Sequence, residues 1–268
     1  LNSGRIIGIE GSGQLLNTTR VNIAGGSLVI FNEPGKNEHD NVAGIGRIND
    51  SAEIRSTGGT FNFNFDPNEG AASYSENVGA LVVGNGNLNL ITSRAVEGHT
   101  SLLTFNSLTH QRGGTLNLSG AAVGGLLNTA TNVLTIDTRN RVRITTLPAM
   151  SNNIIGGWAT TTNSKINQDG NTVSTVDFLT RDGSGILRAF NNYTLANSTN
   201  ATTNQSGWSE AANLNVLLST NATLNANRFL NSLKIESGSS RTLNLGNATR
   251  RLTIQTGGII SRGNTQII

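Results

Sequence analysis

The stretch GGTFNFNF at residues 58–65 decides the fold of this chain. Two glycines make a turn, and the residues after them alternate strictly between apolar and small polar side chains. This alternation is typical of a β-strand with one buried face and one face in water. The phrase returns in altered form along the chain, as GGSLVIF (25–31), GNLNLIT (86–92), GGTLNLSG (113–120), SLKIESG (232–238), RTLNLGN (241–247) and RLTIQTGG (251–258).

A repeated strand-and-turn unit predicts a stacked architecture, because one unit cannot bury its apolar face alone. Between residues 78 and 138 the apolar segments recur about every 9–14 residues, which leaves no room for helical crossovers. An antiparallel sandwich and a parallel β-helix both fit such short strands. Hairpin signals of the Asn-Gly or Asp-Gly kind are scarce, which favours the helix. We therefore expect an all-β parallel β-helix (β-solenoid) with about 20–27 residues per turn and stacked Asn and Thr ladders at its corners, beside the strands.

The composition excludes several other classes of protein. Only 13% of residues are charged and 4% are aromatic, whereas glycine occurs 32 times. The net charge of +3 is spread thinly, and the aromatic residues are too few for the base stacking of a nucleic-acid interface. The absence of cysteine excludes disulfides, thiolate metal sites and cysteine nucleophiles. No apolar run approaches the ~18 residues of a membrane helix.

The rhythm of the strands divides the chain into three parts. We expect a β-solenoid over 1–148 with loops at 32–41 and 66–77, a loop-rich elaboration of the same solenoid over 149–211, and further β-solenoid over 212–268. The chain begins in mid-pattern and ends in apolar, strand-like sequence without a cap. Because uncapped strand edges invite more strands, we expect a segment processed or excised from a longer protein, or copies that stack end to end.

Four segments in order resemble the autotransporter-associated β-strand repeat proteins. They are LLTFNSLTHQRGGTLNLSG (102–120), RVRITTLP (141–148), NNIIGGWATTT (152–162) and GILRAFNNYT (185–194). The tail is similar to the same proteins through LNSLKI (230–235), RTLNLGN (241–247) and RLTIQTGGIISRGN (251–264). The resemblance covers about 100–268 well and the first part loosely, and the ordered combination with IIGGWA is its most specific part.

The resemblance implies a right-handed parallel β-helix passenger of a very large surface protein from a Gram-negative bacterium. Such a passenger is exported and is displayed on the outer cell surface or released outside the cell. The family supplies no catalytic residues to carry over. The chain shows no recognisable signal peptide, so the export route and the anchoring follow only from the resemblance.

The acidic and histidine residues do not converge on a catalytic or metal-binding pattern. We expect the acids to be solvated turn residues, and His39, His99 and His110 lack the spacing of zinc ligands. Asn167, Asp169 and Asn171 leave a structural calcium as a minor alternative, although no EF-hand acid follows them. We therefore predict no catalytic, metal or cofactor residues. The closest acidic groups are Glu38-His39-Asp40, Asp66 with Glu69, and Asp177 with Asp182.

A row of arginines is the one candidate contact for a charged polymer. Arg139, Arg141 and Arg143 alternate on a strand, so they share one face while Val142 and Ile144 point the other way. Guanidinium groups suit the sulfate, carboxylate or phosphate groups of a surface polysaccharide. The preferred interpretation is a charged row that keeps this face in water.

Glycan attachment to asparagine is a second candidate feature of the chain. Four Asn-x-Ser/Thr sequences crowd into a short polar run, at Asn192, Asn197, Asn200 and Asn204. Trp158 and Trp208 could stack on sugars, but packing of the elaboration against the stack is the preferred interpretation.

Two functions follow. The first is a non-enzymatic structural segment of a bacterial surface stalk, fibre or filament, with or without an adhesive role, whose partners are its own copies or further repeats. The alternative is a carbohydrate-active enzyme or a polysaccharide-binding adhesin on a β-helix scaffold. Three acids meeting in one groove, and loss of polymer cleavage on neutralising them, would distinguish the enzyme.

Overall fold

The computed structural model describes residues 2–32, 46–65, 73–94, 101–122, 133–134, 140–166, 172–196, 205, 208–236, 241–262 and 265–267. The chain divides into two compact units. The first unit comprises Leu1–Pro148, Ala159–Thr175 and Thr180–Ala189, and the second comprises Ala149–Trp158, Val176–Leu179 and Phe190–Ile268. Within the described ranges the regular elements are all strands, so the expected all-β class is confirmed. Those ranges contain no helix long and apolar enough to cross a membrane.

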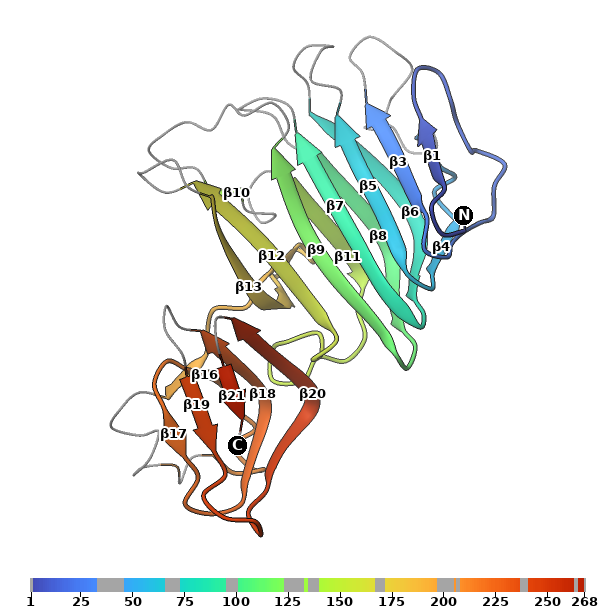
Figure 1. Cartoon of the computed structure of the whole chain (residues 1–268). Coiled ribbons are helices and arrows are strands. Elements are labelled where there is room, and N and C mark those ends of the chain that lie inside the picture. The colour runs from blue at the N-terminus through green and yellow to red at the C-terminus, as the bar shows by residue number, and fades with distance from the viewer. Residues whose placement is uncertain are drawn as a thin grey trace. The chain divides into compact units, whose positions relative to one another are not determined.

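The first unit is built on two sheets (Figure 1). The nine-stranded sheet contains, in spatial order, β1 (Ile6–Ile9), β3 (Ser27–Asn32), β5 (Gly59–Phe65), β7 (Gly86–Arg94), β9 (Gly114–Ala122), β12 (Ala159–Ile166), β13 (Thr172–Arg181) and β14 (Leu187–Ala189), with β10 (Val133–Leu134) beside β12. The five-stranded sheet contains β11 (Asn140–Thr146), β8 (Ser101–His110), β6 (Tyr74–Val83), β4 (Glu53–Ser56) and β2 (Arg20–Ile23).

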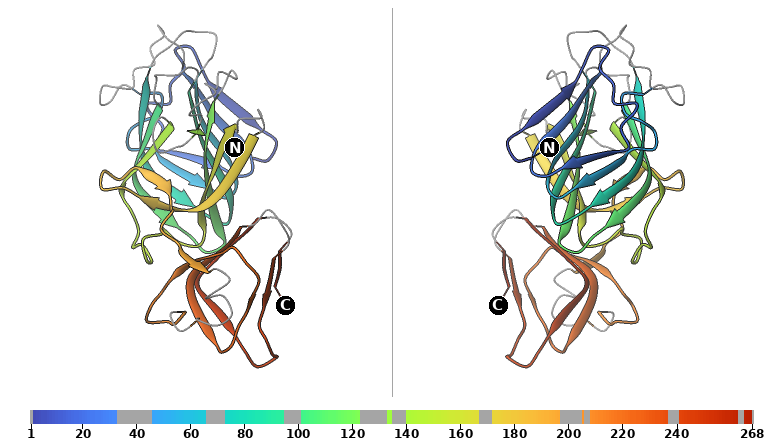
Figure 2. Two further views of the ribbon diagram at one scale, coloured as in Figure 1. Left: turned by 90° about the vertical axis from the view of Figure 1, so that its left-hand side faces the viewer. Right: turned by 90° about the vertical axis from the view of Figure 1, so that its right-hand side faces the viewer.

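From β1 to β9 the chain alternates between these two sheets. Each odd-numbered strand pairs in parallel with the next odd-numbered strand, and each even-numbered strand pairs with the next even-numbered one. The views along the stack in Figure 2 show the two sheets of the first unit as two layers. Parallel pairing of this kind confirms the preference for parallel strands over an antiparallel sandwich, with β10 and β12 as an antiparallel exception.

Register explains why the repeated phrase folds as it does. Leu28, Phe61, Leu90 and Leu118 pair in succession and form one buried column of the nine-stranded sheet. Phe61 also meets Phe105 of the five-stranded sheet edge to face, with ring centroids 6.1 Å apart. Strict alternation in the sequence therefore places every second side chain between the two sheets.

The polar positions of the phrase form ladders on the outward face of the nine-stranded sheet. The Thr115 hydroxyl donates to Asn87 Oδ1 at 3.0 Å, and the Thr162 hydroxyl donates to Asn117 Oδ1 at 3.0 Å. Both bonds join neighbouring strands at successive turns of the chain. Asn and Thr side chains thus bond between turns as expected, but within the strands and not at the corners. These bonds explain why the outward positions are small and polar rather than charged.

The turns of the first unit match the expected length only in part: the turn from Ile7 to Leu28 and the turn from Val78 to Phe105 fall within it, and others are longer. One turn runs from Leu28 to Phe61, the next from Phe61 to Leu90, and the next from Leu90 to Leu118, each exceeding the expected ~20–27 residues. The connection from Leu118 to its partner Thr161 is longer still. The longer turns were not predictable, because the sequence does not show which alternating segments share a sheet.

The second unit repeats the same rule on a smaller scale. Its four-stranded sheet contains β15 (Thr194–Ala196), β16 (Asn215–Leu218), β18 (Arg228–Glu236) and β20 (Leu252–Arg262), and its three-stranded sheet contains β17 (Ala222–Thr223), β19 (Arg241–Asn244) and β21 (Thr265–Ile267). The pairing in both sheets is parallel. Leu233 and Ile235 from β18 and Leu243 from β19 share one buried core with Trp208.

Two of the expected loop regions contain strands. Residues 74–77 of the expected loop 66–77 belong to β6, while 66–72 lie outside the described residues, as does most of the expected loop 32–41. The loop-rich elaboration expected over 149–211 is wrong for β12, β13, β14 and β15. The hydrophobic alternation of these strands is weak, because Thr and Asn stand at inward as well as outward positions. The sequence pattern therefore did not indicate strands here.

The IIGGWA motif is explained by a close backbone approach within the second unit. A Cβ atom on Gly157 would lie 2.4 Å from the backbone nitrogen of Gly258, and one on Gly258 would lie 2.5 Å from the Gly157 Cα. Gly258 belongs to β20 and is buried. Two glycines from distant parts of the chain are therefore needed where their backbones touch.

Replacing Gly258 with alanine should destabilise the second unit by about 1–3 kcal/mol, because the new methyl group overlaps the Gly157 backbone and the Phe178 ring. Both tryptophans belong to the second unit, so urea unfolding followed by tryptophan fluorescence measures the effect. Gly183→Ala is the matched control, since nothing lies within 4 Å of a Cβ at that position. Equal unfolding midpoints for the Gly258 variant and the unmodified chain would contradict the close approach.

Candidate functional site

The arginine row lies on the outward face of the five-stranded sheet. Val142 and Ile144 of β11 are buried, and Arg141 and Arg143 lie half-buried on the opposite face, as the alternation predicted. Arg139 lies outside the described residues. The buried Nε atom of Arg143 has no hydrogen-bond partner in the described part of the chain. Contact of this row with a polyanion stays a prediction.

At the other end of the five-stranded sheet, the Glu53 carboxylate forms ion pairs with two arginines. Arg20 Nε and Arg55 Nε each lie 2.9 Å from Glu53 Oε1. Hydrogen bonding from Arg55 is the largest influence on the Glu53 carboxyl, and together with Arg20 it lowers the pKa of Glu53. Because these three side chains are only partly buried, water screens the network and it contributes little to folding stability. Its effect is to offset arginine charge on this part of the sheet.

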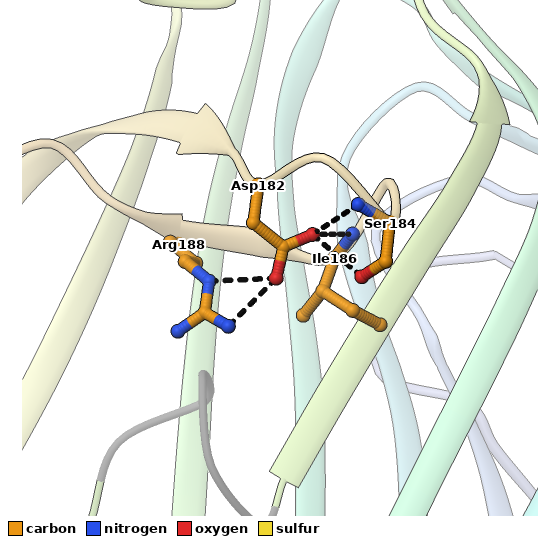
Figure 3. Close-up of polar contacts among 4 residues, drawn as sticks. All are labelled: Asp182, Ser184, Ile186 and Arg188. Atoms are coloured by element: carbon orange, nitrogen blue, oxygen red, sulfur yellow. Dashed lines mark hydrogen bonds and ion pairs between the residues drawn. The ribbon is translucent and has the colours of Figure 1, made fainter.

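Asp182 organises the turn between β13 and β14 (Figure 3). Its Oδ1 accepts hydrogen bonds from the Ser184 backbone N–H at 2.9 Å, the Ser184 hydroxyl at 2.7 Å and the Ile186 backbone N–H at 3.0 Å. Its Oδ2 accepts from Arg188 Nε at 2.9 Å and Nη2 at 2.6 Å. Burial opposes ionisation, but the bonds from Ser184, Arg188 and Ile186 together lower the pKa of Asp182 well below its usual range. The expected turn role of Asp182 is confirmed.

Asp177, in contrast, is not a solvated turn residue. It is buried in the second unit, and its Oδ1 lies 2.5 Å from Lys234 Nζ. Lys234 Nζ also lies 2.8 Å from Glu236 Oε2 and 5.5 Å from the centre of the Tyr193 ring. We call Asp177, Tyr193, Lys234 and Glu236 the Lys234 cluster. The expectation of a solvated Asp177 was wrong, because side chains far away in the sequence cover it.

The electrostatics of the Lys234 cluster are those of a poorly hydrated site. Burial raises the pKa of Asp177, although the hydrogen bond and charge of Lys234 act against that rise. Burial likewise raises the pKa of Tyr193, so the phenol stays protonated. Desolvation disfavours the ionised form of Glu236, but Lys234 and Arg262 outweigh it and lower the pKa of Glu236. The cluster thus combines the Asp177 carboxyl, which burial makes harder to ionise, the ionised Glu236 carboxylate and the amino group of Lys234.

A second buried charged group lies in the first unit. The Glu76 side chain is fully buried, and its two carboxylate oxygens accept the backbone N–H groups of Arg47 at 2.9 Å and Ile48 at 2.8 Å. Burial is the main influence and raises the pKa of Glu76 to about 7. Arg47 is also buried, and its guanidinium donates to backbone carbonyl oxygens of Gly11, Gly13 and Phe31.

The remaining predicted residues are spread over the chain. Asn192 is exposed, while Asn197, Asn200 and Asn204 lie outside the described residues. Trp208 is buried in the core of the second unit, and Trp158 is half-buried. The packing role preferred for Trp208 is thereby confirmed.

No arrangement of three or more His, Cys, Asp or Glu side chains suited to a metal ion occurs among the described residues. His110 Nε2 lies 3.0 Å from the carbonyl oxygen of Gly114. The other residues considered for acid or metal chemistry lie outside the described part of the chain, namely Glu38, His39, Asp40, Asp66, Glu69, His99, Asn167, Asp169 and Asn171.

Sequence reasoning missed Lys234, Glu236, Glu76 and Arg47. For Glu76 a signal existed, because it shares strand parity with Val78, which is buried. For Lys234 and Glu236 the alternation along the strand predicted outward side chains, and the Tyr193 ring that lies against Lys234 comes from a distant part of the chain. Comparisons with protein-family models, curated proteins and solved structures found no match for this chain.

Proposed function

We propose that this chain is a non-enzymatic structural segment of a bacterial surface stalk, fibre or filament. In this proposal the alternating parallel sheets are a right-handed β-helix, as in autotransporter-associated repeat proteins, exported to the cell surface or beyond. The support is architectural: β1 to β9 in the first unit and β15 to β21 in the second unit pair in parallel with strands one turn away. Such a stack needs no cofactor, and its natural partner is more strand of the same kind.

The observation that carries the proposal is the edge formed by β1 and β2. β1 is the end strand of the nine-stranded sheet, and β2 is the end strand of the five-stranded sheet. Ile6 and Ile7 on β1 are 74% and 48% exposed, whereas apolar residues further into the nine-stranded sheet, such as Phe61 on β5, are buried. An end strand that carries exposed apolar side chains is suited to accept another turn of strands. That turn would come from a second copy or from further repeats of the same protein.

Electron microscopy of the purified chain tests the assembly. We expect rods joined end to end, and a 4.7–4.9 Å strand repeat continuing across the junctions. The double variant Ile6→Lys with Ile7→Lys should give isolated particles, because charge on an edge strand blocks pairing. Leu16→Lys, at an exposed apolar residue in a turn, should assemble like the unmodified chain. Isolated particles at every concentration of the unmodified chain would contradict stacking, and antibody labelling confined to the cell interior would contradict surface display.

The alternative is a polysaccharide-binding adhesin or a carbohydrate-active enzyme on the same scaffold. The half-buried Arg141 and Arg143 on one face are the observation that favours it. Retention on a sulfated polysaccharide that is lost with Arg141→Gln and Arg143→Gln would support the adhesin. Release of oligosaccharides from a polymer substrate would support the enzyme.

A further inference from the structure

The Lys234 cluster brings together the three groups needed to make an amide bond between two side chains. Lys234 supplies an amine whose Nζ is 2.5 Å from Asp177 Oδ1, and Glu236 supplies a second carboxylate 2.8 Å from the same nitrogen. The Lys234 side chain is only 5% exposed. All of these residues belong to the second unit. We propose that Lys234 and Asp177 condense to an intramolecular isopeptide bond, with Glu236 as the proton carrier.

The surroundings of the cluster are apolar. The side chains of Ile154, Phe178, Phe190 and Ile260 form an apolar cluster against which Tyr193 packs. A buried ion pair gives up the hydration of both charges, so transfer of a proton from ammonium to carboxylate relieves that cost. Burial raises the pKa of Asp177, which acts in the same direction. The transfer leaves a free amine beside a neutral carboxylic acid.

Tyr193 and Glu236 have separate parts in this reaction. The Tyr193 hydroxyl is hydrogen-bonded to Asp177 and also accepts the Phe178 backbone N–H at 3.2 Å, which fixes its position. A hydrogen bond donated to the acid polarises its carbonyl toward attack. Glu236 is held ionised by Lys234 and Arg262, so it can accept a proton from the attacking nitrogen.

The atoms balance without any other reactant. Lys234 Nζ attacks Asp177 Cγ and forms the C–N bond, and one Cγ–O bond then breaks. Glu236 accepts a proton from the nitrogen and delivers it to the departing oxygen, which leaves as water. The ammonium and carboxylate together thus yield one amide and one water molecule. Fixed contact between the partners replaces a bimolecular encounter, and exclusion of bulk water opposes the reverse hydrolysis.

The isopeptide bond would give this chain a covalent cross-link between side chains. The chain has no cysteine, so a disulfide is impossible. Asp177 and Lys234 are 57 residues apart in sequence, and a bond between them would close that loop in the unfolded chain. By the reasoning that applies to disulfides, closing a loop of this length stabilises the folded state. The inference does not rest on the proposed function, because it concerns a reaction within one chain.

Intact-mass spectrometry of the purified full chain tests the proposal. We expect a mass one water molecule below that of the sequence, and a linked peptide pair containing residues 177 and 234 after proteolysis. The chain has three lysines, Lys36, Lys165 and Lys234. Lys165→Met should therefore leave the water loss intact, whereas Lys234→Met should abolish it.

Two further variants separate the chemistry from mere packing. Asp177→Asn should give the same amide by losing one ammonia in place of water, and Glu236→Gln should leave most of the protein at the full sequence mass. The peptide map of the unmodified chain decides the question even if a variant does not fold. A folded, unmodified chain at its full sequence mass, or a link mapped to other residues, would overturn the proposal.

Discussion

Replacing Phe61 with alanine should lower the free energy of unfolding of the first unit by about 3–5 kcal/mol. Phe61 is completely buried, pairs between Leu28 and Leu90 in the column of the nine-stranded sheet, and meets Phe105 across the core. The substitution removes the ring and leaves a cavity between the two sheets, which close-packed neighbours can only partly fill. Urea unfolding followed by circular dichroism measures the change.

Thr60→Ala is the matched control for Phe61→Ala. Thr60 precedes Phe61 on β5, so its side chain lies on the opposite face of the strand and is half-buried. We expect a change of less than about 1 kcal/mol, because no large apolar side chain is removed from the core. If both variants lost the same stability, the assignment of inward and outward faces from the repeated phrase would be wrong.

The stability of the first unit should fall as the pH rises from about 4.5 to about 7, because of Glu76. Its pKa is raised from the ordinary 4.5 to about 7 in the folded chain, so the folded state binds a proton more tightly than the unfolded state. The stability that this group contributes is fully present below pH 4.5 and is lost as the pH rises through 7. The loss amounts to about 3 kcal/mol for a shift of this size.

The Glu76→Gln variant isolates this effect. It should lose most of the dependence of the unfolding midpoint on pH between 5 and 8, and it should be less stable at low pH because the amide nitrogen faces a backbone N–H group. Glu53→Gln is the control, since the pKa of Glu53 is lowered and that group titrates below this window. An unchanged pH slope in Glu76→Gln would show that Glu76 is not the responsible group. Every other titratable group is the same in both chains and cancels in the comparison.

Local sequence was sufficient for the strands and for the direction of their side chains. The alternation in β5, β7 and β9 specified which residues are buried, because a period of two has only one consistent assignment. The glycines before these strands predicted turns, and Gly59 and Gly86 have the positive φ angles of 116° and 129° that favour glycine. These features depend on neighbours a few residues away, so they can be predicted from a single sequence.

Pairing and charge burial were not predictable in the same way. Which strand lies beside β9 depends on the chain between Leu118 and Thr161, whose length carries no register signal. Asp177 and Asp182 look alike in sequence, yet one is buried against Lys234 and the other caps an exposed turn. The difference comes from Lys234 and Tyr193, which meet Asp177 only after the chain has folded back.

The unequal length of the turns has a consequence for how this protein can change. The connection from Leu90 to Leu118 and the longer one from Leu118 to Thr161 both advance the sheet by a single strand. The columns therefore constrain a few positions in each turn and leave the rest of the turn without a prescribed length. Foreign peptides grafted between strands would be carried outward at regular intervals, and the scaffold beneath them would keep its register.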